Sequence, residues 1–549
     1  MAIVRTLCGQ CAVGCGVRAV TDEGRSLSFE GDPVHPANGG LLCPQSDALA
    51  AMSSLDGRLL HPMLDGQRIG WQRAIGHAVR RLKDVLARHG PDSVAMHVAG
   101  NLLTEDYYVA NKLMKGFVGS AHIDGPSWQD GGMEAAYRAG LGEDVVPGSY
   151  EDVDRADLIL AVGASTLLRH PVLVDRIRMA REHGDARLIL LTDGQDAPEV
   201  AADLHLSIVP GSAAAMLSGL LLHGHDSGLL AVDFLSRHVS VSEDFWTRLR
   251  PDHDLWSVGR RCGLAPADVR AFYDLFASTR RVVTLYGPAA GEEHDQRLPQ
   301  AILNLYLAMG WIGTPGAAPI GIARAPNAMG EREVGCDSGQ LAAHRDFSTH
   351  SIAQAARFWG AQRMAEQPGL TGAALAGAIG DGQIKLLWLL GGLPPLGNPL
   401  RATLGKLPFV ILSTPWLEPG LPPEGLLALP SPVWIEKDGT VTGADRLISR
   451  QRRLFPLPGE ARPDWWSLTQ VARSMGWHDA FHYERPAEIY REHARLTAYR
   501  NEGERLLNLR RHAPISNPAY DELTPWRWGE LPFDGGHFLN PDGKARLLI

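Results

Sequence analysis

The chain has 549 residues, of which 45% are hydrophobic and 21% charged, with a formal net charge of −9 at pH 7. A chain of this length can fill the cores of three or four domains. The negative charge argues against nucleic acid or an anionic membrane surface as a partner. Since no apolar run is long enough for a bilayer-crossing helix, no membrane span is expected.

Four cysteines near the start, Cys8, Cys11, Cys15 and Cys43, follow the spacing C-x2-C-x3-C-x27-C. Four thiolates in this arrangement can hold a [4Fe–4S] cluster, three from one short loop and the fourth from a returning segment. The alternative is a structural zinc site, but such sites usually carry two short cysteine pairs and the second is missing. Because Cys8 lies so close to the start, no leader peptide is expected, and the protein is predicted to be cytoplasmic. A reducing compartment disfavours a disulfide framework.

Short apolar runs of strand type alternate with helical patterns along the rest of the chain. The runs lie at residues 93–98, 157–163, 187–191, 281–286, 384–390 and 409–413, and the clearest helical patterns at 105–118, 171–183 and 299–309. Continuous apolar strands between amphipathic helices indicate parallel sheets that are covered on both faces. The predicted fold class is therefore α/β. Sheets of this kind bind ligands at the carboxyl ends of their strands.

Several segments resemble a known family. Residues 31–43 (GDPVHPANGGLLC) are similar to the opening of molybdopterin oxidoreductases that bind bis-molybdopterin guanine dinucleotide. Other segments resemble assimilatory nitrate reductases in particular, in the same order along nearly the whole chain: residues 100–124, 326–335, 343–346, 436–442 and 448–466.

The resemblance implies a domain layout. Residues 1–55 would form a small [4Fe–4S] domain, against which a later segment, about 440–540, packs back. Residues 56–134 and 326–439 would form a discontinuous Rossmann-like α/β domain, and residues 135–325 an inserted, dinucleotide-binding-like α/β domain. In nitrate reductases the turn and strand that match residues 540–549 lead into a fourth, β-rich domain, whereas this sequence stops at Ile549. We therefore expect that domain to be absent and the face it would cover to bind a redox protein partner or a second copy of the chain.

The resemblance also identifies a position for a molybdenum ligand. Related nitrate reductases carry a ligating cysteine just after a His-Ile-Asp sequence, but residues 122–133 here read HIDGPSWQDGGM. Counted without a gap from His122, the ligand position is Asp130; counted back from Tyr137, it is Gln129. A carboxylate is a competent molybdenum ligand, so Asp130 is the candidate catalytic residue. The alternative is an ordinary turn aspartate before two glycines.

The pterin-site positions that the resemblance suggests are seven residues: Gly163, Asp193, Pro210, Gly211, Arg332, Asp438 and Thr442. Around them, polar residues of the family have been replaced, by Gln45, Ala213, Ala325, Gly391 and Gly443 among others. Each lost partner of a buried polar group typically costs ~1–3 kcal/mol. We interpret the pterin site as weakened or empty, and leave open whether the bis-molybdopterin guanine dinucleotide with its molybdenum is bound.

Two functions remain. The preferred one is an iron–sulfur electron-transfer or scaffold subunit of a redox complex, with a degenerate molybdenum site. The alternative is an active molybdenum-dependent assimilatory nitrate (oxyanion) reductase that uses Asp130 as metal ligand. Arg324, Arg332 and Arg345 would then either attract the oxyanion or serve only as salt bridges.

Overall fold

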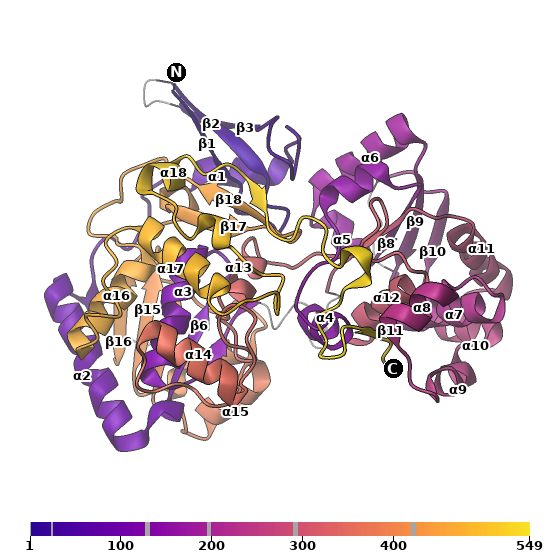
Figure 1. The fold of residues 1–549 in the computed structure, drawn as a ribbon. Helices are drawn as coiled ribbons and strands as arrows, with labels where there is room; N and C mark the ends of the chain where they lie inside the picture. The colour runs from indigo at the N-terminus through magenta and orange to yellow at the C-terminus, as the bar shows by residue number, and fades with distance from the viewer. Residues whose placement is uncertain (1, 23–25, 127–131, 195–198, 289–294, 419–423) are drawn as a thin grey trace.

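Two sheets, one in each of two lobes, organise the structure (Figure 1). The computed structural model describes residues 2–22, 26–126, 132–194, 199–288, 295–418 and 424–549. The first lobe contains a seven-stranded sheet in the order β5-β4-β16-β15-β14-β6-β7, in which β16 to β7 are parallel and β4 and β5 are antiparallel additions. Its strands are β4 (Met63–Leu64), β5 (Gln67–Arg68), β6 (Val94–Val98), β7 (Ile123–Asp124), β14 (Leu386–Leu390), β15 (Val410–Thr414) and β16 (Leu426–Pro430).

The second lobe contains a fully parallel sheet of five strands in the order β10-β9-β8-β12-β13. Its strands are β8 (Leu158–Val162), β9 (Arg187–Thr192), β10 (Leu204–Ser207), β12 (Val282–Tyr286) and β13 (Ala318–Gly321). Every residue of β8, β12 and β14 is buried, which is why these strands read as unbroken apolar runs in the sequence.

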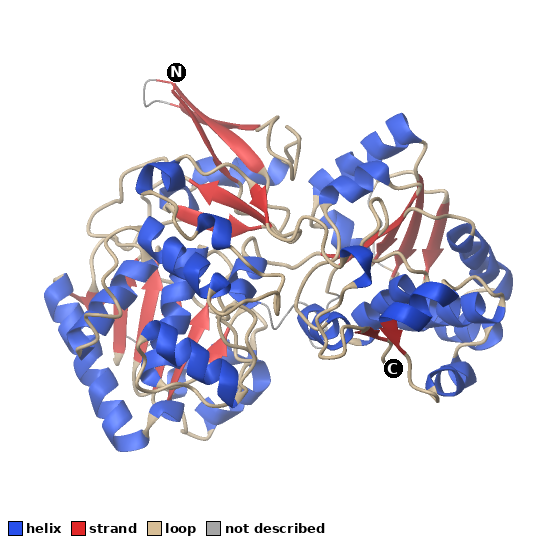
Figure 2. Cartoon of the chain, in the orientation of Figure 1, coloured by secondary structure: helices blue, strands red, loops and turns tan. Residues whose placement is uncertain are grey.

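Helices cover both faces of each sheet (Figure 2). On α2 the buried residues Ala74, Ile75, Ala78, Val79, Leu82 and Val85 fall on one side, as the period of 3.6 residues requires. The first lobe uses α2 (Trp71–His89), α3 (Thr104–Leu113), α13 (Ala328–Glu333), α14 (Thr349–Trp359), α15 (Gly372–Gly380), α16 (Asp464–Met475), α17 (Pro486–Ala498) and α18 (Asn517–Asp521). The second uses α4 (Met133–Leu141), α5 (Ala164–Leu168), α6 (Pro171–Gly184), α7 (Ala213–Asp226), α8 (Val232–His238), α9 (Phe245–Leu249), α10 (Leu255–Cys262), α11 (Pro266–Ala277) and α12 (Arg297–Ala308).

Three small sheets complete the fold. The antiparallel sheet of β1 (Ala2–Leu7), β2 (Gly16–Asp22) and β3 (Ser26–Gly31) carries the cysteine loop and precedes α1 (Asp47–Ala51). A second sheet joins β17 (Gly439–Thr442), β18 (Leu447–Gln451) and β19 (Trp526–Arg527), and β18 packs against β1. Near the end of the chain β20 (Ala545–Arg546) pairs with β11 (Val239–Ser240) of the second lobe.

The structure confirms the α/β class with parallel sheets, and it refines the expected elements. The helix expected at residues 105–118 ends at Leu113 and continues as a single π-helical segment, η3 (Met114–Val118). Short 3-10 helices that matter below are η1 (Pro44–Ser46), η5 (Tyr150–Arg155) and η8 (Trp434–Glu436). The exact domain boundaries stay a prediction.

Candidate cluster and cofactor site

The cysteine loop connects β1 to β2. Cys8 follows directly on β1 and Cys15 directly precedes β2, and the Cys8 amide donates to the Cys15 carbonyl at 2.9 Å, which closes the loop. Cys43 immediately precedes η1, and Ser46 Oγ donates to its carbonyl oxygen at 2.9 Å. Cys8, Cys15 and Cys43 are buried and Cys11 is partly exposed, and none of the four is in a disulfide.

The electrostatics of the four thiols shows that they gather at one place. Burial and, to a smaller extent, the charges of Cys11 and Cys43 raise the pKa of Cys8 to about 12, and burial and the charge of Cys43 raise that of Cys11 to about 11. Burial followed by repulsion from Cys11, Cys8 and Cys43 also raises the pKa of Cys15. The backbone amides of Gln10 and Val13 oppose this by hydrogen bonding to the sulfurs of Cys8 and Cys11, respectively. Buried thiols of this kind ionise when a metal centre replaces their protons.

The donor set therefore fits a [4Fe–4S] cluster. Four thiols with backbone N–H groups directed at their sulfurs are the ligands and the hydrogen bonds that such clusters use. Among the described residues, no group of three or more His, Cys, Asp or Glu side chains is gathered closely enough to hold a single metal ion. The four cysteines are the residues that would hold the cluster, and Cys8, Cys11 and Cys15 would take one side of it.

The segment around η8 packs against the cysteine loop and forms a hydrogen bond with it. Trp434 Nε1 donates to the Leu7 carbonyl at 2.9 Å. The Trp434 ring lies only 2.3 Å from the position that a Cβ on Gly9 would take. Gln451 Oε1 accepts hydrogen bonds from Thr6 Oγ1 at 3.0 Å and from the Leu7 amide at 3.2 Å. Trp434 and Gln451 thus close one side of the cluster loop.

The second lobe brings four of the seven suggested pterin-site residues together. Gly163, at φ +80°, follows β8, and Asp193 follows β9, so both lie at the carboxyl ends of parallel strands. They line one crevice with Gly211, and Gly211 and Pro210 line the pocket that adjoins it. Asp193 Oδ1 is buried and has no hydrogen-bond partner among the described residues. This is the ligand-binding edge of a doubly wound sheet.

The adjoining pocket has a volume of about 690 Å³ and shares Gly211 and Ala214 with the crevice. Its polar walls include Ser218, His253, Arg261 and Asn304. The crevice and this pocket together are large enough for a nucleotide. The Ser212 hydroxyl, however, donates to the Val209 carbonyl at 2.6 Å, and Ala213 supplies no carboxylate at the position where the family has an aspartate.

The other three suggested residues, Arg332, Asp438 and Thr442, lie in the first lobe and at its boundary with the cluster domain, and each contacts other protein groups. Arg332 Nε lies 2.9 Å from Asp144 Oδ2, and Arg450 Nη2 donates to Asp438 Oδ1 at 2.7 Å. The Thr442 hydroxyl donates to Glu333 Oε2 at 2.9 Å. The prediction for Asp130 falls on residues 127–131, which lie outside the described part of the chain.

Buried polar atoms without hydrogen-bond partners surround Arg332. Among the described residues, Glu134 Oε2, Asp144 Oδ1, His344 Nε2 and both ring nitrogens of His493 make no hydrogen bond. Burial raises the pKa of Glu134 to about 7 and lowers that of His493 to about 3. Because buried polar atoms are normally paired, a concentration of unpaired ones indicates a place for a polar ligand or water. The buried polar atoms near Arg332 therefore fit a polar cofactor such as a molybdopterin.

Comparison with known proteins agrees with this geometry. The family model for molybdopterin oxidoreductase matches residues 58–474, and the model for the molybdopterin oxidoreductase Fe4S4 domain matches residues 1–52. The chain belongs to the molybdopterin oxidoreductase family. Its [4Fe–4S] cluster and a molybdopterin are thereby supported as cofactors, and the molybdenum and the guanine dinucleotide remain open.

Within this molybdopterin oxidoreductase family, nitrate reductases are close relatives. The nitrate reductase of Klebsiella oxytoca is 39% identical over 100% of this chain and 64% of its own length, and that of Shewanella frigidimarina is 34% identical over 100% and 61%. The chain thus spans less than two thirds of either protein. The periplasmic nitrate reductase of Desulfovibrio desulfuricans is 26% identical over 86% of the chain and 66% of its own length.

The fold is shared with a solved structure of another protein. Acetylene hydratase from Pelobacter acetylenicus superposes with a TM-score of 0.76 over 99% of this chain and 77% of that protein, at 17% sequence identity. This similarity concerns the fold alone. None of the helices in the described part of this molybdopterin oxidoreductase chain has the length and apolar character that a bilayer crossing requires.

Arg345 is not part of a funnel for oxyanions. Its guanidinium is buried, and it donates to the carbonyls of Leu496 and Tyr499 at 3.2 and 2.8 Å and to Gln354 Oε1 at 3.2 Å. These contacts hold the end of α17 against the loop that follows α13. The neighbouring His344 Nδ1 lies 2.8 Å from Glu143 Oε1.

Sequence reasoning missed Glu134, Asp144 and His493. Glu134 is in the first turn of α4, only a few residues after the candidate ligand Asp130, and that proximity was the one signal that could have found it. No such signal marks Asp144 or His493, because nothing in the sequence connects either residue with Arg332, which lies far from both along the chain.

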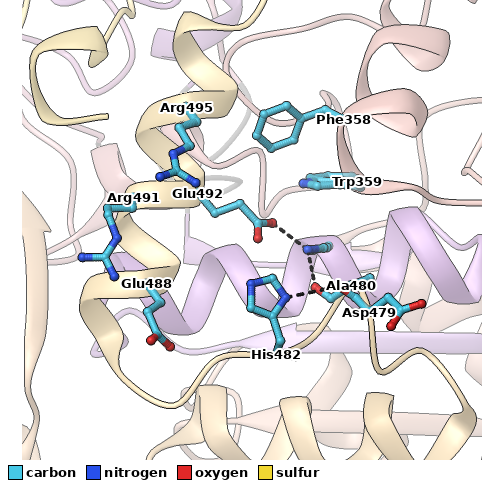
Figure 3. A pocket seen from close by; sticks show the side chains of 10 residues that line it. Phe358, Trp359, Asp479, Ala480, His482, Glu488, Arg491, Glu492 and Arg495 are labelled. Atoms are coloured by element: carbon cyan, nitrogen blue, oxygen red, sulfur yellow. Dashed lines mark hydrogen bonds and ion pairs between the residues drawn. The ribbon is translucent and has the colours of Figure 1, made fainter. Parts of the chain in front are cut away.

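A separate polar pocket of about 520 Å³ lies between α14, α17 and the loop after α16 (Figure 3). Lys112 Nζ donates to the Ala480 carbonyl and to Glu492 Oε1, both at 2.6 Å, and to the Tyr483 hydroxyl at 2.8 Å. All three ammonium protons are therefore engaged within the protein. These bonds attach α3 to α17, so we assign Lys112 a structural role.

Proposed function

We propose that the chain is an iron–sulfur electron-transfer or scaffold subunit of a nitrate-reductase-like redox complex in the cytoplasm. The observation that carries this proposal is the pairing of Arg332, Asp438 and Thr442 with Asp144, Arg450 and Glu333. Groups that would otherwise meet a polar cofactor thus have protein partners. The four cluster cysteines, by contrast, are complete and close together.

In this proposal the cluster supplies one-electron chemistry when bound. The chain's own residues hold it: four thiolates ligate the iron, and the amides of Gln10 and Val13 stabilise the sulfurs of Cys8 and Cys11. Trp434 and Gln451 fix the loop and limit the access of water. A rigid, partly desolvated loop keeps the ligands in place when the charge of the cluster changes.

An active oxyanion reductase is the second candidate. It is favoured by the buried atoms of Glu134, Asp144 and His493 that make no hydrogen bond to any described residue. Such a reductase would bind the molybdenum cofactor between these atoms and the crevice of the second lobe. Arg332, beside Asp144, would orient an anionic substrate. Nitrate as substrate rests on the names of the relatives.

Metal analysis of anaerobically purified protein separates the two candidates. Iron at about four atoms per chain without molybdenum or tungsten supports the electron-transfer subunit, and the wild type then reduces no nitrate with reduced viologen. Stoichiometric molybdenum together with nitrate turnover supports the reductase. In that case Asp130→Ala should abolish turnover and leave the iron content unchanged.

A redox protein partner or a second copy of the chain is part of the proposal. Three exposed apolar side chains follow the carboxyl ends of β14 and β15: Leu396, Trp416 and Leu417, which are 87%, 40% and 38% exposed. Arg401 joins the two loops that carry them, since it donates to the Pro394 carbonyl at 2.9 Å and to Glu418 Oε2 at 2.5 Å. A patch of exposed apolar side chains usually marks an interface, and these loops are where we propose that the partner binds.

A further inference from the structure

Tyr150, the first residue of η5, differs from the other fully buried tyrosines. Its side chain has no exposed surface, and its hydroxyl has no hydrogen-bond partner among the described residues. Tyr107, Tyr306 and Tyr490, which are equally buried, donate to or share a hydrogen bond with Ala99, Val282 and His512, respectively. Leaving a buried hydroxyl unpaired destabilises a fold, so a partner outside the protein atoms is expected.

The surroundings of Tyr150 point to the cysteine loop. Its amide donates to Asp445 Oδ2 at 3.4 Å, and the amide of the adjacent Ala444 donates to the Ala12 carbonyl at 3.1 Å, inside the loop. Tyr150, Cys8 and Cys15 belong to one continuous core. Burial, then Asp445, then the thiols of Cys11 and Cys15 raise the pKa of Tyr150 well above its ordinary value. A tyrosine hydroxyl carries its proton at neutral pH, so it can donate a hydrogen bond to an acceptor that the protein itself does not supply.

Two arginines, Arg527 and Arg176, hold the segment around Tyr150 in this position. Asp445 is fixed by Arg527, which donates to its Oδ2 at 2.5 Å and to Glu151 at 2.8 Å. Arg176 of α6 donates to the carbonyls of Pro36 and Ala37, in the segment that leads to Cys43. The start of η5 is thus attached to both parts of the cluster domain.

We propose that the Tyr150 hydroxyl donates a hydrogen bond to a sulfur of the [4Fe–4S] cluster on the side held by Cys11 and Cys15. The bond stabilises the cluster more after it has accepted an electron, because its sulfurs then carry more negative charge. Tyr150 accordingly raises the reduction potential and keeps its proton in both states. The proposal requires the cluster alone, so it holds for either function proposed above.

Tyr150→Phe tests the proposal in the full-length protein, with the reduction potential measured by an EPR-monitored titration. The variant should keep its iron, because the hydroxyl has no protein partner to leave unpaired, and its midpoint potential should become more negative. Tyr306→Phe is the matched control, since it removes a buried hydroxyl bonded to Val282 and Thr284 and should leave the potential unchanged. A wild-type potential in an iron-replete Tyr150→Phe protein would overturn the proposal.

Two further variants keep the test decisive. A difluorotyrosine at position 150 is a stronger donor of nearly the same shape, so it should shift the potential in the positive direction; no shift would refute the bond even if Tyr150→Phe lost its iron. The alternative acceptor is Asp445 Oδ1, which is also buried and has no hydrogen-bond partner in the described part of the chain. If Asp445→Asn reproduces the whole shift of Tyr150→Phe and the double variant shifts no further, the hydroxyl acts through Asp445 and the direct bond is wrong.

Discussion

At the scale of single residues, the thiols of the cysteine loop are the chemistry that the sequence identifies most directly. Burial, together with the proximity of the other thiols, holds the pKa values of Cys8, Cys11 and Cys15 above their ordinary value, so a cluster that binds must displace their protons. The cluster then contributes to the stability of the first domain as well as to redox chemistry.

Cys11→Ser and Cys43→Ser should each remove most of the iron and lower the thermal stability of the protein. The expected iron content falls from about four atoms per chain toward zero, since a cubane needs four ligands. Iron analysis and the EPR signal of the reduced protein measure the loss. Cys262→Ser, at a buried cysteine outside the loop, is the control and should keep the iron. Equal iron loss in all three variants would contradict the assignment.

A second prediction concerns Glu105 and the dependence of the protein's stability on pH. It is buried and accepts hydrogen bonds from the Thr440 amide and hydroxyl and from the Tyr520 hydroxyl, at 2.8, 2.9 and 2.6 Å. Burial nevertheless raises its pKa from 4.5 to about 7. A carboxyl whose pKa is raised in the folded state stabilises the fold fully below pH 4.5, and this contribution is lost as the pH rises through about 7. The loss amounts to ~3 kcal/mol.

Glu105→Gln should therefore flatten the pH dependence. Melting temperatures are measured from pH 4.5 to 8. As the pH rises, the melting temperature of the variant should increase relative to that of the wild type. Glu502→Gln, at an exposed residue, should parallel the wild type at every pH. A constant difference between wild type and Glu105→Gln would show that Glu105 does not titrate in this range.

At the scale of elements, the sequence predicted the buried central strands and missed the irregular ones. The expected strands at 157–163, 281–286 and 384–390 are confirmed as β8, β12 and β14, because their side chains are buried on both sides. Among the missed strands are β10, at a sheet edge, where exposed residues alternate with buried or partly buried ones, and β13 and β16, which contain prolines. Their pairing with a neighbouring strand, rather than their local composition, makes them strands.

The contact between Gly9 and η8 gives a prediction for the cluster loop. Gly9→Ala places a Cβ at 2.3 Å from the Trp434 ring, so the loop or the ring must move. We expect a destabilisation of ~1–3 kcal/mol with partial iron loss. In a Trp434→Ala background, where the ring is gone, the same substitution should cost much less.

Gly377→Ala is the control for Gly9→Ala. Gly377 is an exposed residue of α15, and no atom lies within 4 Å of the position that an alanine methyl group would take, so alanine should be neutral or slightly stabilising there. Thermal unfolding and iron content are measured for Gly9→Ala, Trp434→Ala, the double variant and Gly377→Ala, each against the wild type. If the destabilisations caused by Gly9→Ala and Trp434→Ala simply add in the double variant, a clash with the Trp434 ring is not the reason why alanine is unfavourable at position 9.

At the scale of the whole molecule, the apolar side chains beyond β14 and β15 predict association. If Leu396 lies in an interface, Leu396→Lys should reduce self-association or the recovery of a redox partner by at least tenfold, because the interface would bury an unpaired charge. Light scattering and co-purification under gentle lysis measure this. Leu229→Lys changes an exposed leucine of the second lobe and should have no effect. A monomeric wild type with no recovered partner would contradict the prediction.

The sequence by itself determined the α/β class and the family, and it predicted the cluster ligands. These depend on spacing within short segments, on the period of apolar residues and on motifs that follow one another along the chain. The positions of Gly163 and Asp193 could also be predicted, because each follows a strand that the sequence shows and the carboxyl ends of parallel strands lie at one edge.

Only the tertiary structure decided which buried groups meet. The pairs Arg332 with Asp144, Thr442 with Glu333 and Arg345 with Leu496 join residues more than a hundred positions apart. The same is true of Tyr150 and the cysteine loop, since each is ordinary in its own segment. Such contacts depend on how the lobes pack, and the desolvation that changes the chemistry of a buried polar group exists only once that packing has excluded water.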